Sequence, residues 1–180
     1  MTTVINFYGG PGCGKSTMAA QLFGEMKSRT INVEYVPEFA KELTWKQSDC
    51  LDDQLYLLGE QHHRIYTLFG KTDYIITDSP LLLTLHYLKN SFSKFKDNKE
   101  LLDQLHVSMT MATLFLYKFY NNINFNIVRN PNKKFLQKGR NQTLKQSIAI
   151  DNDINMLLTQ YNIPFKSVKT FDQVLQHLKL

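Results

Sequence analysis

Gly9-Gly10-Pro11-Gly12-Cys13-Gly14-Lys15-Ser16-Thr17 is the stretch that decides the fold of this chain. It fits the phosphate-binding loop pattern G-x-x-x-x-G-K-[ST] without a gap. The preceding run, Thr3–Tyr8, is rich in β-branched and aromatic residues and predicts a strand, and the run Lys15–Ser28 predicts a helix. The motif requires this strand–loop–helix context. We therefore expect residues 10–17 to hold the phosphates of a nucleoside triphosphate.

Three residues of this loop have distinct expected roles. Lys15 is expected to reach the β- and γ-phosphates, Ser16 to bind Mg²⁺, and Thr17 to contact the α-phosphate. The alternative interpretation is a glycine-rich turn that only caps a helix. Motif and context together favour ATP and Mg²⁺ as the bound cofactors.

Length and composition limit the class of protein. A chain of 180 residues predicts a single domain over residues 1–180. No run approaches the roughly 18 apolar residues of a transmembrane span, and a strand at the N-terminus leaves no room for a signal peptide. The two cysteines, Cys13 and Cys50, cannot form a disulfide framework. We expect a cytoplasmic protein with no membrane association.

The charge is unevenly distributed. The formal net charge is +5, and no acidic residue lies between Asp103 and Asp151. The basic residues of that stretch are Lys118, Arg129, Lys133, Lys134, Lys138, Arg140 and Lys145. This pattern indicates either a solvated basic face or a polyanionic ligand, which would be nucleotide phosphates or nucleic acid.

Strand-like and helix-like segments alternate along the chain, which predicts an α/β fold with a parallel sheet. Further strands are expected at residues 31–36, 73–78, 124–128 and 165–168. Further helices are expected at residues 51–69, 81–88, 99–120, 143–161 and 171–178. Helix 143–161 has Ile148, Ile154 and Leu158 among its buried candidates. Trp45 falls in a polar connection, where it either covers a ligand or packs in an ordinary way.

Two carboxylates stand at strand ends, where ligands of open α/β sheets gather. Asp78 ends the strand 73–78 and is expected to hold Mg²⁺ or its water, the alternative being a strand-end cap. Glu38 follows the strand 31–36 and is expected to orient or deprotonate an acceptor hydroxyl. The alternative for Glu38 is a carboxylate that interacts with a helix dipole, and Glu42 is then the substitute.

Two arginines flank a basic segment that is expected to form a lid over residues 129–142. Phosphoryl transfer spreads negative charge over oxygens that a guanidinium meets with two donors. Arg129 and Arg140 are therefore expected to stabilise the transferred group while the lid excludes water. Arg140 is the stronger candidate because Gly139 permits a sharp turn before it. The alternative is an exposed, mobile basic loop.

With these residues assembled, the chain resembles a small phosphate-loop kinase of the compact, phage-type, AAA-like family related to nicotinamide-riboside kinases. The resemblance rests on residues 9–17, 37–41, 76–82 and 139–142. It implies a nucleoside- or nucleotide-kinase-like P-loop NTPase with a five-stranded parallel sheet in three α/β/α layers and a short basic lid. The chain departs from well-studied deoxynucleoside kinases at residues 78–80, where those enzymes carry an arginine, so their nucleoside-reading pattern does not carry over.

The resemblance and the residues together predict an ATP- and Mg²⁺-dependent phosphotransferase. Its expected acceptor is a nucleoside, a nucleotide or a hydroxymethylated pyrimidine, in the last case within phage DNA, and the protein would then work in the cytoplasm of the host cell. The alternatives are an acceptor-independent NTPase switch, a nucleic-acid-binding ATPase, or a protein that senses nucleotides without chemistry. Nothing in the sequence predicts an oligomeric state.

Overall fold

A five-stranded parallel sheet with the strand order β2-β3-β1-β4-β5 forms the centre of the computed structural model, which describes residues 2–139 and 141–180. The strands are β1 (Thr3–Tyr8), β2 (Val33–Val36), β3 (Tyr74–Thr77), β4 (Asn121–Ile127) and β5 (Lys166–Val168). β1 pairs with β3 on one side and β4 on the other, so the strand that leads into the phosphate loop is central. The expected fold class is confirmed.

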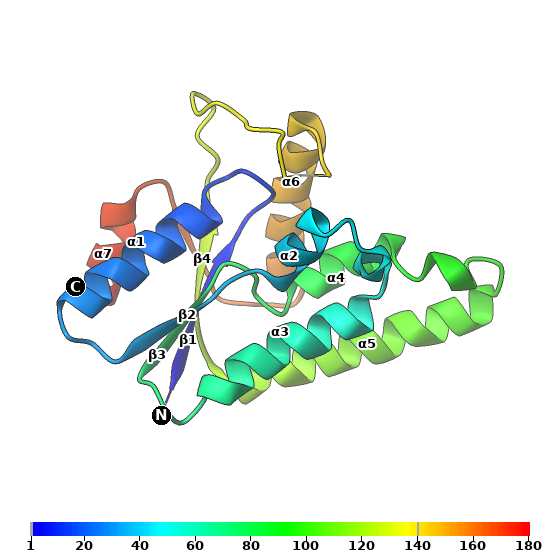
Figure 1. The fold of residues 1–180 in the computed structure, drawn as a ribbon, viewed down its shortest axis with the longest axis horizontal. Helices are drawn as coiled ribbons and strands as arrows, with labels where there is room; N and C mark the ends of the chain where they lie inside the picture. The colour runs from blue at the N-terminus through cyan, green and yellow to red at the C-terminus, as the bar shows by residue number, and fades with distance from the viewer. Residues whose placement is uncertain (1, 140) are drawn as a thin grey trace.

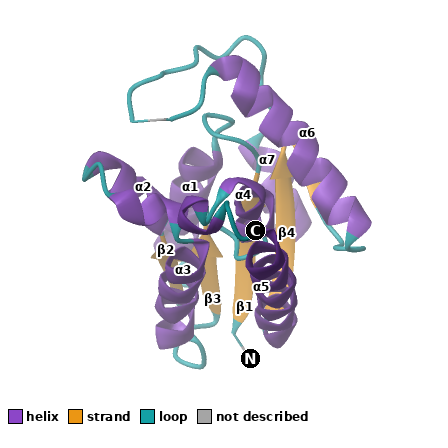
Figure 2. Ribbon diagram, turned by 90° about the vertical axis from the view of Figure 1, so that its right-hand side faces the viewer, coloured by secondary structure: helices purple, strands orange, loops and turns teal. Residues whose placement is uncertain are grey.

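Helices cover both faces of this sheet and make the three layers visible in Figures 1 and 2. The α-helices are α1 (Lys15–Ser28), α2 (Phe39–Trp45), α3 (Gln54–Leu68), α4 (Leu83–Tyr87), α5 (Lys99–Phe119), α6 (Leu144–Gln160) and α7 (Phe171–Leu178). Short 3₁₀ helices occupy Asp49–Asp52, Leu88–Asn90 and Ser93–Phe95. Among the described residues no helix is long and apolar enough to cross a membrane.

Successive side chains of β1 point to opposite faces of the sheet and pack into clusters on both of them. Ile5 and Phe7 point to a cluster built with α1 and α7, whereas Val4 points to a second cluster built with α3 and α5. Tyr8 joins a third cluster between α4 and α6. Successive side chains of a strand face opposite sides of its sheet, so a central strand that is apolar on both sides must be covered twice.

Four local features differ from the sequence-based expectation. Residues 39–45 form helix α2, where a polar connection was expected, and the expected helix 51–69 begins as a 3₁₀ turn before α3 starts at Gln54. β4 starts at Asn121 rather than at residue 124 because its asparagines are hydrogen-bonded within the sheet, as Asn6 Nδ2 donates to Asn122 Oδ1 at 2.9 Å. In α6 the expectation for Ile148 was wrong: it is exposed, and Ile150 is buried with Ile154 and Leu158.

Candidate active site

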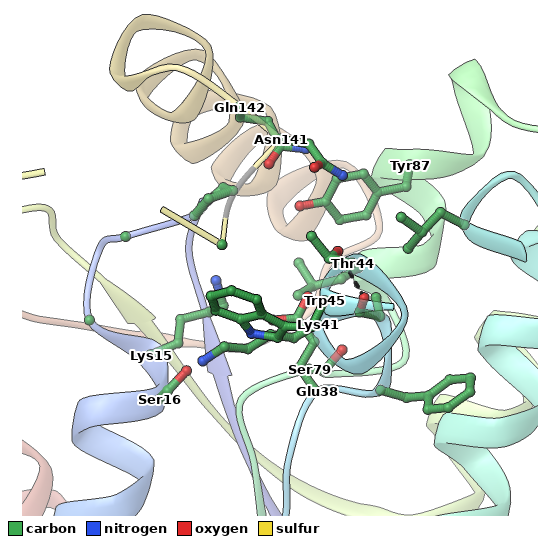
Figure 3. Close-up of a pocket in the computed structure, with 18 of the residues that line it drawn as sticks. Lys15, Ser16, Glu38, Lys41, Thr44, Trp45, Ser79, Tyr87, Asn141 and Gln142 are labelled. Atoms are coloured by element: carbon green, nitrogen blue, oxygen red, sulfur yellow. Dashed lines mark hydrogen bonds between the residues drawn. The ribbon is translucent and has the colours of Figure 1, made fainter. Parts of the chain in front are cut away.

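A cavity of about 1050 Å³ opens beyond the carboxyl ends of the strands. Its walls are the phosphate loop, α2, the first part of α3, α4 and residues 133–139 and 141–142. Figure 3 shows Lys15 and Ser16 on one side of this space and Glu38, Lys41 and Trp45 on another. One cavity therefore joins the phosphate loop to the strand-end region where acceptor residues were expected.

The phosphate loop owes its shape to glycine. Gly9, Gly12 and Gly14 have φ values of 136°, 76° and 116°, a region that side-chain-bearing residues rarely adopt. Gly14 precedes α1 in this left-handed conformation, and in the described part of the chain no side chain caps that helix. The N–H groups of the first turn and the positive end of the helix dipole are thus left for an anion.

The side chain of Lys15 lies against the backbone of the phosphate loop. Its Nζ donates to Gly9 O at 2.8 Å and to Gly10 O at 3.2 Å. Burial by itself lowers the pKa of Lys15, but Cys13 and then Glu38 lead the negative groups that raise the pKa above its usual value. The ammonium is therefore charged and lies at the edge of the cavity.

The hydroxyl oxygens beside Lys15 are suitable ligands for a hard, strongly hydrated cation. Ser16 and Thr17 line the cavity with hydroxyl groups. In residues 2–139 and 141–180 no group of three or more His, Cys, Asp or Glu side chains could hold a metal ion. Mg²⁺ keeps several waters and takes one or two protein ligands together with phosphate oxygens, so the Ser16 hydroxyl beside the phosphate loop suits it.

Asp78 lies behind the cavity wall, which its neighbour Ser79 lines. It is 2% exposed, and its Oδ1 accepts a hydrogen bond from Glu38 N at 3.0 Å. Burial raises the pKa of Tyr35, and the negative charge of the nearby Asp78 raises it further, so the Tyr35 hydroxyl lies close to this carboxylate. Asp78 thereby ties the ends of β2 and β3 together and fixes the backbone of Glu38.

Glu38 begins α2 without capping it. The residue is the N-cap in extended conformation, with no side-chain cap hydrogen bond. Its carboxylate lines the cavity and is one of the negative groups that raise the pKa of Lys15. The substitute candidate, Glu42, is exposed and forms ion pairs with Lys46 at 2.8 Å and Arg64 at 3.3 Å. The geometry therefore favours Glu38 over Glu42 as the group that meets an acceptor.

Gln61 of α3 is a site residue that sequence reasoning missed. It is 5% exposed, and its Oε1 accepts a hydrogen bond from Phe39 N at 3.1 Å. Its Nε2 donates to Thr77 Oγ1 at 3.3 Å and to Pro37 O at 3.4 Å. A polar residue on an amphipathic helix carries no sequence signal for this role. It holds the chain on both sides of Glu38, so that the carboxylate starts from a fixed backbone.

Arg129 lies against the phosphate loop and does not line the cavity. Its Nε donates to Asp151 Oδ2 at 2.5 Å, and its Nη2 donates to Pro11 O at 2.9 Å. Asp151 Oδ1 also accepts from Gly10 N at 2.6 Å. Asp151 of α6 was not a sequence candidate. These contacts assign Arg129 a place behind the loop, where the Arg129–Asp151 pair fixes the backbone of residues 10–11.

The segment 133–142 covers the cavity from the side opposite α3. Lys133, Lys134 and Lys138 line the cavity there, and Asn141 and Gln142 continue the wall (Figure 3). The candidate Arg140 lies outside the described residues.

Trp45 of α2 is 57% exposed and faces the segment 133–142. Its indole lies so close to Gly139 that a Cβ there would be 2.7 Å from the ring. Trp45 therefore lines the cavity and also packs against the basic segment at Gly139.

The chain matches a family model described as an AAA domain over residues 4–173. No curated protein matches it by sequence. A crystal structure of NadR protein in complex with NR is similar at a TM-score of 0.70 and 15% identity, with 99% of this chain and 52% of that chain covered. This chain thus spans about half the length of the NadR structure.

Two further solved structures share the fold. Thymidylate kinase from Candida albicans is similar at a TM-score of 0.52 and 17% identity, covering 98% of this chain and 88% of that one. Deoxyadenosine kinase from M. mycoides with bound dATP is similar at a TM-score of 0.55 and 14% identity, covering both chains fully at 100%. At such identities the likeness shows the fold.

Proposed function

The chain belongs to the AAA-domain family, and from that premise we propose that it is an ATP- and Mg²⁺-dependent kinase. The proposed acceptor is a nucleoside, a nucleotide or a hydroxymethylated pyrimidine, which may be free or part of DNA. The carrying observation is that the phosphate loop and Glu38 line the same cavity. That volume, about 1050 Å³, reaches the upper end of the range of single-ligand sites and supports room for two ligands.

Each residue of the proposed mechanism is assigned by its position. Lys15 would leave the carbonyl oxygens of Gly9 and Gly10 and donate to the β- and γ-phosphates. Ser16 would hold Mg²⁺, which would supply positive charge to the phosphate groups. Glu38 would accept the proton of the acceptor hydroxyl or orient that hydroxyl toward the γ-phosphate.

Asp78 has two proposed contributions that the same geometry supports. It was expected to hold Mg²⁺ or its water, and its position at the end of β3 keeps that proposal open. Its hydrogen bond from Glu38 N adds a second role, in which Asp78 positions the acceptor carboxylate. We also propose that Arg140, within a lid formed by residues 129–142, stabilises the transferred phosphoryl group.

The choice of acceptor class rests on similar proteins of known structure and on the lysines of the basic segment. One of these proteins is NadR in complex with NR, and the other two are a thymidylate kinase and a deoxyadenosine kinase, which supports an acceptor of nucleoside or nucleotide type. Lys133, Lys134 and Lys138 favour an acceptor or donor rich in phosphate. A DNA acceptor would use the same lysines, and its binding would weaken steeply as salt rises.

The test is transfer of labelled γ-phosphate from ATP to nucleosides, nicotinamide riboside, nucleoside monophosphates, and DNA with and without hydroxymethylated pyrimidines. We expect label on one acceptor class, and removal of Mg²⁺ with a chelator should abolish it. Label released only as free phosphate, unchanged by any acceptor, would contradict the kinase proposal and support an NTPase switch.

A matched pair of variants tests the assignment of Glu38. Glu38→Gln should lower transfer by about 100-fold or more while ATP affinity stays within a few-fold. Glu42→Gln, four residues away and exposed, should leave transfer unchanged. Equal effects of the two changes, or full activity of Glu38→Gln, would remove Glu38 from the mechanism.

A further inference from the structure

Helix α5 carries an apolar stripe on the side that faces away from the sheet. Val107, Met111, Phe115 and Phe119 are 60%, 68%, 71% and 46% exposed. Residues four apart lie above one another on a helix, so the four side chains form one continuous row, called here the α5 stripe. Figure 1 shows α5 along an outer edge of the molecule, beside α3.

Val107, Met111 and Phe115 of the α5 stripe lie outside the core clusters, whereas Phe119 at its end also packs against the rings of Phe69 and Tyr120. α5 packs on the molecule through its other side, where Met109 and Thr113 are buried and Leu105 and Leu116 lie against the cluster beneath α3. Single exposed apolar residues are common, but four large ones in a continuous row form a patch of the kind that marks an interaction surface. The stripe is therefore a surface built for contact.

Charge and shape along α5 indicate the partner. Acidic residues Glu100 and Asp103 lie near the beginning of the helix, and Lys118 lies near its end. A shallow hollow of about 400 Å³ is lined by Asp103, Gln104, Val107 and Ser108. The same helix thus presents Asp103 beside a hollow and, near its other end, Lys118 close in sequence to its most exposed aromatic side chain, Phe115.

We propose that the α5 stripe binds the α5 stripe of a second copy of this chain, antiparallel and around a two-fold axis near Met111. In that arrangement Phe115 lies opposite the hollow of the partner subunit, and Lys118 lies near Asp103 of the partner subunit. A parallel arrangement would place like charges together. Self-complementarity under a two-fold axis is the condition for an isologous dimer, and the placement of Asp103 and Lys118 on α5 meets it in charge.

The surface extends beyond α5. The α5 stripe from Val107 to Phe119 is about 18 Å long at 1.5 Å per residue, whereas a stable dimer buries about 800 Å² on each partner. Tyr66 of α3 is 56% exposed and borders the same edge, because the ring of His62 lies between the rings of Tyr66 and Tyr120, at 5.7 Å and 6.0 Å, and Phe119 lies 5.1 Å from Tyr120. The contact therefore includes α3, and a pair of helices from each copy supplies the area.

Sedimentation velocity of the full chain over a wide concentration range tests the proposal. The chain should sediment as a dimer, and Met111→Glu should weaken the dimer by about 100-fold or more, because it places a charge at the axis in place of an apolar contact. Met156→Glu is the control, since Met156 is 60% exposed, close to the 68% of Met111, but lies on α6. A dimer that both changes weaken equally, or that neither weakens, would overturn the proposal.

Charge reversal gives a second, independent test. Asp103→Lys alone and Lys118→Asp alone should each weaken the dimer, and the two changes combined should restore it. A chain that is monomeric at every concentration, or reversals whose effects simply add, would contradict an antiparallel contact. Neither measurement uses catalysis, so the outcome is separate from that of the kinase assay.

Discussion

Gly10 occupies a position that the phosphate-loop pattern leaves open to any residue, but the structure leaves it no room for a side chain. A Cβ on Gly10 would lie 2.4 Å from Ser147 O, 2.8 Å from Asp151 Oδ1 and 3.3 Å from Arg129 Nη2. The nearest of these atoms belongs to the backbone of α6, which a rotamer change cannot move. We predict that Gly10→Ala separates α6 from the phosphate loop.

The magnitude follows from two losses. An added methyl group in a filled contact costs about 1–3 kcal/mol. Separation also stretches the hydrogen bond from Gly10 N to Asp151 Oδ1, now 2.6 Å, and bonds to charged groups contribute about 1.5–3 kcal/mol. Because the two losses share one displacement, we expect the free energy of unfolding to fall by about 2–4 kcal/mol.

Urea unfolding of Gly10→Ala and Gly24→Ala measures this effect against a matched control. Gly24 lies within α1, where an added Cβ meets nothing within 4 Å, so alanine there should stabilise the protein by about 1 kcal/mol. ATP affinity, read by calorimetry, should fall in Gly10→Ala and stay unchanged in Gly24→Ala. A Gly10→Ala protein with native stability and native ATP affinity would refute the reasoning.

Three further predictions rest on other parts of the molecule. If Arg129 acts by fixing the phosphate loop, Arg129→Lys and Asp151→Asn should both raise KM for ATP; a loss of kcat confined to Arg129→Lys would instead place the guanidinium on the transferred group. Trp45, the only tryptophan, should change its fluorescence when ATP fills the cavity, and an emission spectrum that is constant up to saturation would contradict its covering position. Burial lowers the pKa of His62 and His86, so in acid the unfolded chain binds more protons than the folded chain. The free energy of unfolding should therefore fall as the pH drops through about 6.5, the usual pKa of histidine. Equal urea midpoints at about pH 5 and about pH 7.5, on either side of that value, would contradict this prediction.

The parts of the fold that the sequence predicted are those with strong local signals. The phosphate loop has a fixed spacing of glycine, lysine and serine, and the apolar runs of β1 and β3 mark central strands. Helix α2 was missed because its seven residues are too few for a clear period. Residues 121–123 of β4 were missed because asparagine is rare in strands, and here its amide groups pair with one another.

The residues of the candidate site also divide into those with a local sequence signal and those without one. Lys15, Ser16 and Glu38 were found because motif and strand ends place them, and all three line the cavity. Gln61 and Asp151 were not found, since each acts on backbone atoms of segments far away in the sequence. Arg129 was expected at the transferred group because its guanidinium has two donors and it begins the basic segment, whereas in the structure its guanidinium contacts Asp151. Contacts of this kind depend on packing, which no local pattern records.

The two ends of the basic segment meet at one place. Arg129 stands at its beginning and Asp151 lies shortly after its end, and both contact residues 10–11 of the phosphate loop. The chain between them leaves and returns to a common anchor, so lengthening it by a few residues adds well under about 1 kcal/mol of closure entropy. The sequence of this connection can therefore be exchanged for another while the contacts of Arg129 and Asp151 with residues 10–11 keep their geometry. The fold thus keeps the contacts of the phosphate loop separate from the basic segment, and under the proposed kinase function a change in that segment would leave these contacts in place.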